Sequence, residues 1–554
     1  MARTYLLHRL KQLYGDFSTA DAQQVPVAEV QAERLRRGPS RRDFLKTAGG
    51  AVTAAALFAG PQRTPGAASP RIAIVGGGIA GLTAALALFD AGYPSTVYEA
   101  SSRVGGRMHS DTTTWANGQI TEHCGELIET SHETILALAK KFRIPIIDLA
   151  AAEPPRATET YYLFGRYYSP AQANNDFTPV YQAVRKDLNA AGYPTLYNRS
   201  TPAAFALDHM SVYEWIDSRV PGGHRSNMGQ LLDLAYNLEF GGETRVQSAL
   251  NLVYSLSAES LAGNFKMFRQ TDERYRLQGG NERLPKAVAA VLPQSSIRLS
   301  TSLTGIARNQ DGTFTLSFKR RAPRPGLSES GLSKPASSES MVVADRVILA
   351  IPFSILRNLD YRNAGFNQVK ILGIQELGYG NNAKLHLQFE TRMWNQSGPW
   401  GRSTGASFAD TGYQNTWDAT RAQNGKTGIL VNFTGGDIGA SFTGEPTDKR
   451  VVRSYAQEFL KNLEPVFPDI TKHWNGRATL DVPARNPYSL GSYAFYKVGQ
   501  CTQFSGSEAE RSGRCHFAGE HCSIEFQGYM EGGAAEGLRA ANEILADYKA
   551  GILP

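Results

Sequence analysis

The sequence predicts a mixed α/β (α+β) fold built around a Rossmann-type unit that begins near residue 70. Three observations predict it: an apolar run at Ile72–Val75, a glycine-rich turn directly after it, and an alanine-rich stretch from Gly81. A buried parallel strand, a tight turn and a closely packed helix, in that order, are the elements of a βαβ unit.

The glycine-rich turn, G-G-G-I-A-G, is typical of a dinucleotide site. Its glycines permit the tight turn and let a pyrophosphate approach the N-terminus of the helix, where free N–H groups and the helix dipole favour anions. Glu99 ends a second predicted strand, T-V-Y-E-A, at the spacing of an acid that holds a ribose hydroxyl. The predicted dinucleotide contacts here are Gly76, Gly78, Ile79, Ala80, Gly81, Glu99 and Ala100.

The next segment, S-S-R-V-G-G-R, contains Arg103, Gly105, Gly106 and Arg107. Paired glycines let the backbone reach a cofactor, and an arginine adds fixed positive charge near phosphate. With this segment the chain resembles flavin-dependent amine oxidases, in which the first glycine fingerprint is followed by R-x-G-G-R. The resemblance implies FAD as the cofactor, because nicotinamide enzymes do not require this second element.

Three further segments extend the resemblance from about residue 70 to the end of the chain. The family's last strand and helix resemble the segment R-C-H-F-A-G-E-H-C-S-I-E-F-Q-G-Y-M-E-G-G. The family's internal strand resembles M-V-V-A-D-R-V-I-L-A-I-P, and its strand beside the adenine resembles S-I-R-L-S-T-S-L-T-G-I-A-R. The resemblance places Glu520 on the ribityl chain and the backbone around Gly528 before the flavin ring. It assigns further cofactor contacts to Gly125, Glu126, Leu303, Met530 and Glu531.

Residues 1–68 are predicted to carry an export address. S-R-R-D-F-L-K (Ser40–Lys46) precedes an apolar stretch, Thr47–Gly60, and small residues at Gly66–Ala68, as in a twin-arginine signal. The apolar stretch is too short for a permanent membrane anchor. We therefore expect a periplasmic or extracellular protein that is exported already folded with its cofactor. Nothing in residues 1–39 predicts a further role.

Charge and cysteine content exclude several classes of function. The chain has 58 Lys/Arg and 51 Asp/Glu, but residues 1–68 hold 10 and 5 of these, so the rest has 48 and 46. This near balance predicts no nucleic-acid surface. The four cysteines, Cys124, Cys501, Cys515 and Cys522, form neither a disulfide framework nor a zinc ligand set, although one bridge, such as Cys501 to Cys515, stays open. No metal site is predicted.

The roughly 485 residues after the signal are too many for one core, so several domains are expected. The segments assigned to FAD lie at both ends, so the FAD-binding domain must be discontinuous. Helical periodicity predicts a helical insertion over the substrate entrance, and strands mixed with turns predict an antiparallel substrate-binding sheet. The predicted division is 1–68 signal, 69–128 FAD-binding, 129–260 helical, 261–369 FAD-binding with a flexible loop at 320–340, 370–490 substrate-binding and 491–554 FAD-binding.

Lys384, in N-N-A-K-L-H-L-Q-F, occupies the place of the family's lysine, which holds a water beside the reactive flavin nitrogen. Burial lowers the proton affinity of a lysine, so that it can position water and assist proton movement. A surface lysine on a strand is the alternative, because Lys384 and His386 would share one face of the strand and Leu385 and Leu387 the other.

Two tyrosines, Tyr529 and Tyr493, match the aromatic pair that flanks the amine in front of the flavin in this family. Flat aromatic faces exclude water and guide a neutral amine to the ring. Packing in the core is the alternative role for each of them. Relatives that bind flavin covalently have a cysteine just before the second tyrosine, whereas Ser492 stands here. Non-covalent FAD is therefore predicted.

The substrate is the difficult assignment. L-amino-acid oxidases of this superfamily use an arginine in a G-x-M-R segment to clamp the substrate carboxylate. In the matching stretch, H-C-G-E-L-I-E-T, Ile128 stands in its place. Acids in segments expected to border the cavity would suit a second cationic group on the substrate, and surface or cofactor-facing positions are the alternative. The predicted substrate contacts are Glu126, Glu129, Trp417, Asp418, Glu525 and Gly528.

The overall pattern resembles secreted bacterial L-amino-acid oxidases that act on basic amino acids, L-arginine first and L-lysine second. The resemblance implies hydride transfer to the flavin, oxygen as the final acceptor, and a 2-oxo acid, ammonia and hydrogen peroxide as products. A primary-amine or polyamine oxidase is the alternative in the same family, and a non-catalytic FAD-binding protein the alternative of another class. The sequence is compatible with a homodimer.

Overall fold

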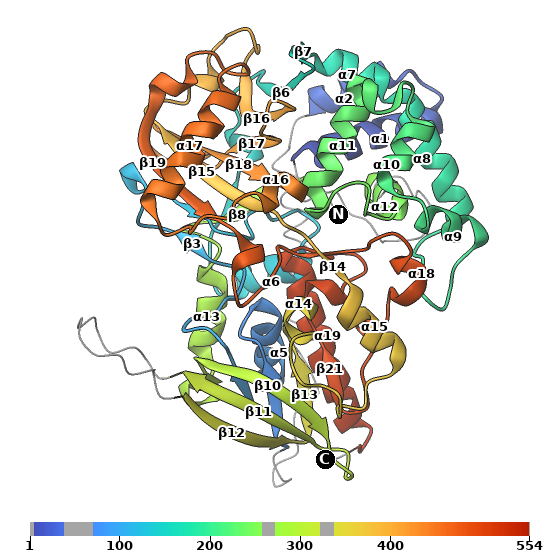
Figure 1. Ribbon diagram of the computed structural model, residues 1–554, viewed down its shortest axis with the longest axis vertical. Helices are drawn as coiled ribbons and strands as arrows, with labels where there is room; N and C mark the ends of the chain where they lie inside the picture. The colour runs from blue at the N-terminus through green and yellow to red at the C-terminus, as the bar shows by residue number, and fades with distance from the viewer. Residues whose placement is uncertain (1–4, 38–69, 258–271, 322–336, 553–554) are drawn as a thin grey trace.

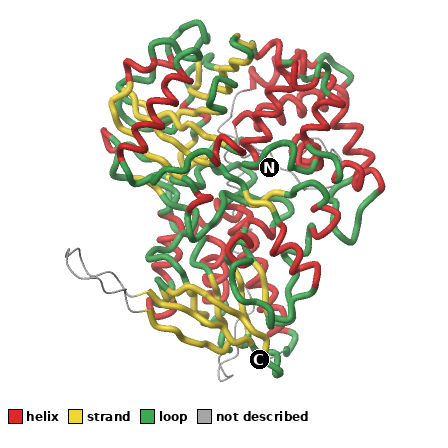
Figure 2. The backbone as a smooth tube through the Cα atoms, viewed as in Figure 1, coloured by secondary structure: helices red, strands yellow, loops and turns green. Residues whose placement is uncertain are grey.

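The structure is a computed structural model that describes residues 5–37, 70–257, 272–321 and 337–552. Figure 1 shows three units: a lower one around a parallel sheet, and an upper pair in which a sheet that is antiparallel except for the β16–β6 pair faces a group of helices. Figure 2 shows the same division, with strands on one side of the upper part and helices on the other. The twin-arginine segment and residues 322–336 of the predicted loop lie outside the described residues.

Five parallel strands form the centre of the lower unit, in the order β21-β13-β1-β2-β9. The central strand β1 pairs with β13 through Ile72 and Arg346, and with β2 through Ile72 and Ser95. The strands come from distant parts of the chain, so the unit is discontinuous, as the predicted fold requires. Their bounds are β1 Ile72–Val75, β2 Ser95–Tyr98, β9 Ile297–Arg298, β13 Arg346–Leu349 and β21 Cys515–Phe517.

Two helices, α5 and α19, cover this sheet and pack on each other. Both carry small residues at the contact, and a Cβ on Gly537 would lie 2.0 Å from the carbonyl oxygen of Ala80. A three-stranded antiparallel sheet completes the unit. The bounds are α5 Ile79–Asp90, α6 Glu133–Lys141, α13 Arg283–Val291, α14 Phe353–Leu356, α15 Gln368–Glu376, α18 Gln500–Phe504, α19 Met530–Lys549, β10 Thr301–Arg308, β11 Phe314–Arg321 and β12 Ser337–Ala344.

The upper sheet has seven strands, in the order β19-β15-β18-β17-β16-β6-β7. Two of them, β6 and β7, come from the segment 129–260, which the sequence predicts to be helical. Their aromatic-rich sequence, T-E-T-Y-Y-L and R-Y-Y, suits strands instead. The bounds are β6 Thr158–Leu163, β7 Arg166–Tyr168, β15 Ala383–Phe389, β16 Ser403–Ala409, β17 Asn415–Asp418, β18 Gly428–Thr434, β19 Trp474–Asp481, α16 Gly436–Ala440 and α17 Lys449–Leu463.

The helical unit includes the start of the chain. Buried residues of α1 share one apolar core with those of α8, α11 and α12. Residues 5–37 are thus part of a folded unit, a role that their sequence does not predict. The bounds are α1 Tyr5–Gln23, α2 Val27–Arg37, α7 Pro170–Asp176, α8 Thr178–Ala191, α9 Pro202–Asp208, α10 Val212–Arg219, α11 Asn227–Phe240 and α12 Ala249–Ser257.

Short two-stranded ladders join segments that are far apart in the sequence. They pair β3 with β4, β5 with β8, and β14 with β20. The last pair brings residues after the upper sheet back to the start of β15, next to the lower unit. The bounds are β3 Ser110–Asp111, β4 Thr121–Glu122, β5 Ile146–Asp148, β8 Tyr275–Leu277, β14 Gly378–Tyr379 and β20 Ala494–Phe495.

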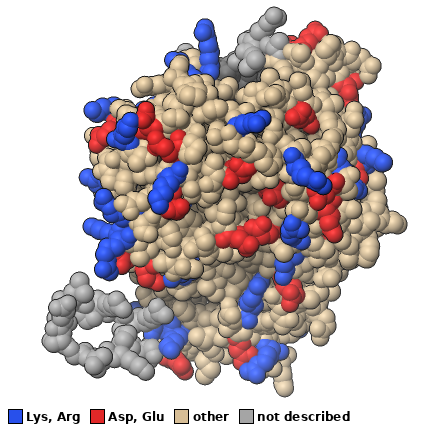
Figure 3. Space-filling view, turned by 45° about the horizontal axis from the view of Figure 1, so that its top comes forward, with Lys and Arg blue, Asp and Glu red and all other residues tan. Residues whose placement is uncertain are grey.

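The face in Figure 3 carries acidic and basic side chains interspersed with one another. Among the described helices, none combines the length and apolar character needed to cross a bilayer.

The contact between α5 and α19 gives a direct test of this packing. We expect Gly537→Ala to destabilise the protein by about 1–3 kcal/mol, because the new methyl group overlaps the Ala80 carbonyl. Helix propensity alone would favour alanine by about 1 kcal/mol. The measurement is the urea midpoint of the purified protein.

The matched control is Gly373→Ala in α15, where a Cβ meets its nearest atom at an ordinary 3.5 Å. This variant should be as stable as the parent or more so. Equal stabilisation by both variants would show that α5 and α19 are not packed this closely.

Candidate active site

The predicted glycine turn lies between β1 and α5. Gly76 has a φ of +107°, and a Cβ there would lie 2.5 Å from the Ala350 carbonyl oxygen. A Cβ on Gly81 would lie 2.0 Å from the Gly76 carbonyl oxygen, so this glycine permits the first turn of the helix to close on the strand. These two positions therefore need glycine for backbone packing.

Gly78 has a different role. A Cβ there would meet only the Cα of Gly106, at 4.0 Å, so the space above the helix N-terminus is open. The R-V-G-G-R segment lies directly beside it, because the Gly105 amide donates to the Gly77 carbonyl across 2.8 Å. Two glycine-rich backbones thus border one space at a helix N-terminus, which fits the pyrophosphate of a dinucleotide.

Glu99 lies at the end of β2, where the sequence predicts the ribose-binding acid. Its carboxylate accepts hydrogen bonds from the amides of Gly77 and Ser101 across 2.7 and 2.8 Å. These bonds fix the acid at the edge of the glycine turn. Leu303, predicted to lie beside the adenine, is buried next to a bulge in β10.

A second polar group connects three of the predicted cofactor segments. Arg107 donates to Glu520 across 2.9 Å and to the carbonyl of Ser492 across 2.7 Å. The other Glu520 oxygen accepts from the Gly528 amide across 2.8 Å. The carboxylate therefore ties the R-V-G-G-R segment to the two C-terminal segments that the resemblance places at the flavin.

Lys384 is buried, 6% exposed, which excludes the surface alternative. From β15 it reaches the lower unit, where its ammonium donates to the Glu126 carboxylate across 2.8 Å and to the carbonyl of Cys124 across 2.9 Å. Trp417 donates to the other Glu126 oxygen across 3.1 Å. Burial alone would raise the pKa of Glu126, but Lys384 holds it below the ordinary value. Three predicted residues thus form one hydrogen-bonded group.

A second set of buried acids lies close by, formed by Glu129, Glu239 and Glu273, and is called the acid set below. Each is at most 3% exposed, and both Glu129 and Glu239 act electrostatically on Glu273. Among the described residues, the two carboxylate oxygens of Glu273 have no hydrogen-bond partner. Of the two carboxylate oxygens of Glu129, only one has a partner there, the Ser131 hydroxyl. Burial raises the pKa of Glu129 to about 7 and that of Glu273 well above its ordinary value.

Glu273 also has a strained backbone, with a φ of +40°. A carboxylate without donors and a left-handed backbone both disfavour folding, and such positions cluster at functional sites. The chemistry that would satisfy the acid set is a cation brought by a ligand.

His132 links the acid set to Tyr529. Its Nδ1 accepts from the Glu129 amide across 3.1 Å, and its Nε2 lies 3.7 Å from the Glu129 carboxylate. Its ring meets the ring of Tyr529 edge to face, with the centroids 5.1 Å apart. Burial lowers the pKa of His132 to about 3, so the imidazole is neutral. The predicted partner Tyr493 donates to the Leu238 carbonyl across 3.1 Å, one residue before Glu239.

Several predicted residues have their side chains in structural contacts. Asp418 faces away from Trp417, its neighbour on β17, and binds Thr420 and the Trp394 indole, so the structure does not bring it to Lys384. The Glu531 carboxylate accepts from two amides at the start of α6, which leaves only its backbone for a cofactor. Met530 packs on Gly125, where a Cβ would lie 2.9 Å from the sulfur.

Ile128 is fully buried in the apolar core of the lower unit, and its backbone pairs with Tyr275. An arginine at this position would point into that core. A carboxylate clamp, if the substrate has a carboxylate, must come from another element.

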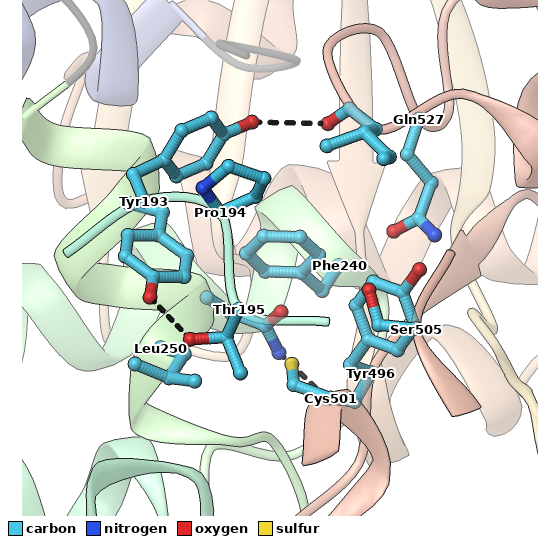
Figure 4. A pocket seen from close by; sticks show the side chains of 12 residues that line it. Tyr193, Pro194, Thr195, Phe240, Leu250, Tyr496, Cys501, Ser505 and Gln527 are labelled. Atoms are coloured by element: carbon cyan, nitrogen blue, oxygen red, sulfur yellow. Dashed lines mark hydrogen bonds between the residues drawn. The ribbon is translucent and has the colours of Figure 1, made fainter. Parts of the chain in front are cut away.

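A small pocket with a volume of about 50 Å³ lies between the helical unit and the C-terminal segments (Figure 4). Two of its lining residues are sequence neighbours of residues described above. Phe240 directly follows Glu239, and Gln527 directly precedes Gly528. Figure 4 shows the Tyr193 hydroxyl pointing across to the Ile524 carbonyl, 3.4 Å away. Glu525, partly exposed beside Ile524, acts electrostatically on Tyr193, which places it at the rim of this pocket.

Four functional candidates were not predicted: His132, Glu239, Glu273 and Arg276. The sequence carries a signal for Glu239, because this acid stands between Leu238 and Phe240 near the end of a helix rich in apolar residues. Arg276 alternates on β8 with two core residues, and it is buried beside Glu126, on whose pKa it acts. The alternation of arginines with apolar residues in R-Y-R-L (Arg274–Leu277) is a sequence signal for Arg276 as well. All four cysteines are free, and no group of metal-binding side chains occurs among the described residues.

Comparison with known proteins identifies the family. The profile described as "Flavin containing amine oxidoreductase" matches residues 79–545. An L-amino-acid oxidase from Siganus canaliculatus is 24% identical over 86% of this chain and 85% of its own length. Nicotine dehydrogenase from Pseudomonas putida is 24% identical over 92% of this chain and 98% of its own length. In structure, the chain is similar to cyclohexylamine oxidase from Brevibacterium oxydans, with a TM-score of 0.71 and 19% identity over 87% of this chain and all of that one.

The structural likeness shows a shared fold, and the residues at the glycine turn, Glu99, Arg107 and Glu520 fit a bound FAD. The profile match covers most of the chain and all of these segments except the first glycines. The chain therefore belongs to the flavin-containing amine oxidoreductase family, with FAD as its cofactor.

Proposed function

We propose that this protein is an FAD-dependent oxidase of basic L-amino acids, with L-arginine as its first substrate and L-lysine as its second. The observation that carries the proposal is the acid set, in which the buried carboxylate oxygens of Glu273 have no donor among the described residues. A substrate with a second cationic group would supply one.

Arg276 supports an amino acid over a simple amine. It lies 3% exposed on the strand face opposite Tyr275 and Leu277, and donates to the Ala419 carbonyl across 3.1 Å. A buried guanidinium between Glu126 and the upper sheet can pair with a substrate carboxylate, which Ile128 cannot do.

The residues of the chain would bind and orient the substrate in this reaction. The acid set holds the distal cation, Arg276 the carboxylate, and Tyr529 and Tyr493 border the space before the flavin. Lys384, held by Glu126, positions water there. FAD, which the glycine turn, Glu99, Arg107 and Glu520 would hold, would supply two-electron oxidation at the substrate Cα, with oxygen as the final acceptor. The released imine is hydrolysed, so that amino acid, oxygen and water give a 2-oxo acid, ammonia and hydrogen peroxide.

A primary-amine or polyamine oxidase is the second candidate. The acid set would bind the second ammonium of a diamine equally well, and the packing of Ile128 in the core supports a substrate without a carboxylate. Export by the twin-arginine route to the periplasm or exterior, non-covalent binding of FAD and a homodimer complete the proposal.

The rate of flavin reduction by L-arginine and by agmatine distinguishes the amino-acid oxidase from the amine oxidase. We expect L-arginine to bleach the oxidised flavin under anaerobic conditions at least tenfold faster than agmatine, which lacks only the carboxylate. The measurement is stopped-flow absorbance of the flavin. Faster bleaching by agmatine would make the protein an amine oxidase.

Arg276→Met should raise the KM for L-arginine about tenfold or more and leave that for agmatine unchanged. The control is Arg274→Met, directly before β8, because the Arg274 guanidinium is already paired with Asp148 across 2.7 Å. An equal effect of both variants on both substrates would contradict a carboxylate clamp at Arg276.

Lys384→Met should retain FAD but slow flavin reduction by roughly 10²-fold or more, because the water position is lost. It should also lower stability by about 3–5 kcal/mol, since Glu126 is left as a buried charge. The double variant Lys384→Met/Glu126→Gln separates the two effects. It should recover thermal stability without recovering the rate, and recovery of both would reduce Lys384 to a structural role.

The pKa of Glu129 predicts a pH dependence. A carboxyl with a pKa of about 7 is neutral below that pH and charged above it, so the acid set gains charge as the pH rises through 7. Between pH 6 and 8 the ionised fraction rises about tenfold. We expect the ratio of kcat/KM for L-arginine to that for L-leucine to rise by a similar factor.

Titration of the substrate α-amino group and of the flavin affects kcat/KM for both substrates equally. These effects therefore cancel in the ratio of the two kcat/KM values. In Glu129→Gln the ratio should stay flat over this range. A ratio that rises equally in this variant would assign the titration to another group near the site, such as Glu273 or Asp272.

A further inference from the structure

The N-terminal helix α1 is packed into the helical unit. It contacts α8, α11 and α12, and its residues Leu10, Leu13 and Tyr14 are almost completely buried. The ring of Tyr14 meets that of Tyr181 on α8 edge to face, with the centroids 4.7 Å apart. Tyr181 also donates to Asp21 across 2.9 Å. An apolar centre with a polar rim is the structure of a specific interface.

One cation of α1 is turned into this interface. Lys11 is 0% exposed, although four methylenes would let its ammonium reach water from most positions. Its charge acts on both Glu129 and Glu273. The third member of the acid set, Glu239, lies on α11, against which α1 packs.

Lys11 therefore brings to the acid set the same group that a basic substrate would bring. An ammonium at the end of an alkyl chain is the side chain of L-lysine itself, and it carries the charge of the L-arginine guanidinium. A buried ammonium is stable only beside opposite charge, so the acid set and Lys11 stabilise each other.

We propose that α1 is a built-in competitive inhibitor that holds Lys11 in the cation site formed by Glu129, Glu239 and Glu273. The competition with a basic substrate rests on the proposed function, whereas the docking of α1 on the acid set does not. α1 lies in the predicted signal region, before its twin-arginine segment, so the cleavage predicted at Gly66–Ala68 would remove the inhibitor together with the signal.

Hydrogen exchange of α1 in the full-length holoenzyme tests the docking without requiring turnover. Lys11→Met should accelerate exchange of the α1 amides at least tenfold, because the ammonium that holds the helix is gone. Glu273→Gln should do the same from the other side of the contact. The matched control is Lys461→Met, a 73% exposed lysine on α17, which should leave α1 exchange unchanged.

Competition is tested in the unmodified protein. Saturating agmatine, added anaerobically, should accelerate α1 exchange at least fivefold, whereas L-leucine, which has no distal cation, should not. In parallel, Lys11→Met should lower the KM for L-arginine at least tenfold and leave that for L-leucine within twofold.

The two proposals fail in different ways. If Lys11→Met and Glu273→Gln leave α1 exchange at the parent rate, α1 is not held by the acid set and the inference is overturned. If both variants accelerate exchange but L-arginine does not reduce the flavin in Lys11→Met, the docking of α1 on the acid set stands and the proposed substrate is wrong. Unchanged α1 exchange with agmatine bound, read from the flavin spectrum, would overturn the competition.

Discussion

The buried ion pair between Lys384 and Glu126 joins two units of the fold at the place where the chemistry is proposed. Lys384 comes from the antiparallel sheet and Glu126 from the segment after β4, 258 positions away in the sequence. A buried charge is stable only while its partner stays within hydrogen-bond distance. The pair therefore fixes the distance between the upper sheet and the FAD-binding unit, and with it the positions of Trp417 and Arg276 relative to the flavin segments.

The acid set shows the opposite arrangement. Lys384 satisfies Glu126 within the chain, whereas Glu273 has a strained backbone and carboxylate oxygens without donors among the described residues. The two acids thus have different environments. Lys384 donates a hydrogen bond to Glu126, whereas Arg421 and Lys11 act on Glu273 electrostatically and its oxygens have no hydrogen-bond donor among the described residues.

Sequence reasoning found the parts of the site whose chemistry is local. The glycine turn, Glu99 and the R-V-G-G-R segment each follow a strand or a turn, and the structure places them as expected. Trp417 and Asp418 could not be told apart, because only the register of β17 decides which of two neighbours faces Glu126. Glu239 and Glu273 become one group only through the packing of α11 on the segment before β8, which no local pattern records. The role of α1 depends on the same packing.

The parallel sheet is completed by β21 and covered by α19, and the ribosome makes both of them long after β1. β1 and the glycine turn therefore leave the ribosome more than 400 residues before the strand and helix that close their site. Once β13 has been made, its outer edge stays unpaired until β21 follows about 165 residues later. We therefore expect a chain that lacks α19 not to retain the cofactor.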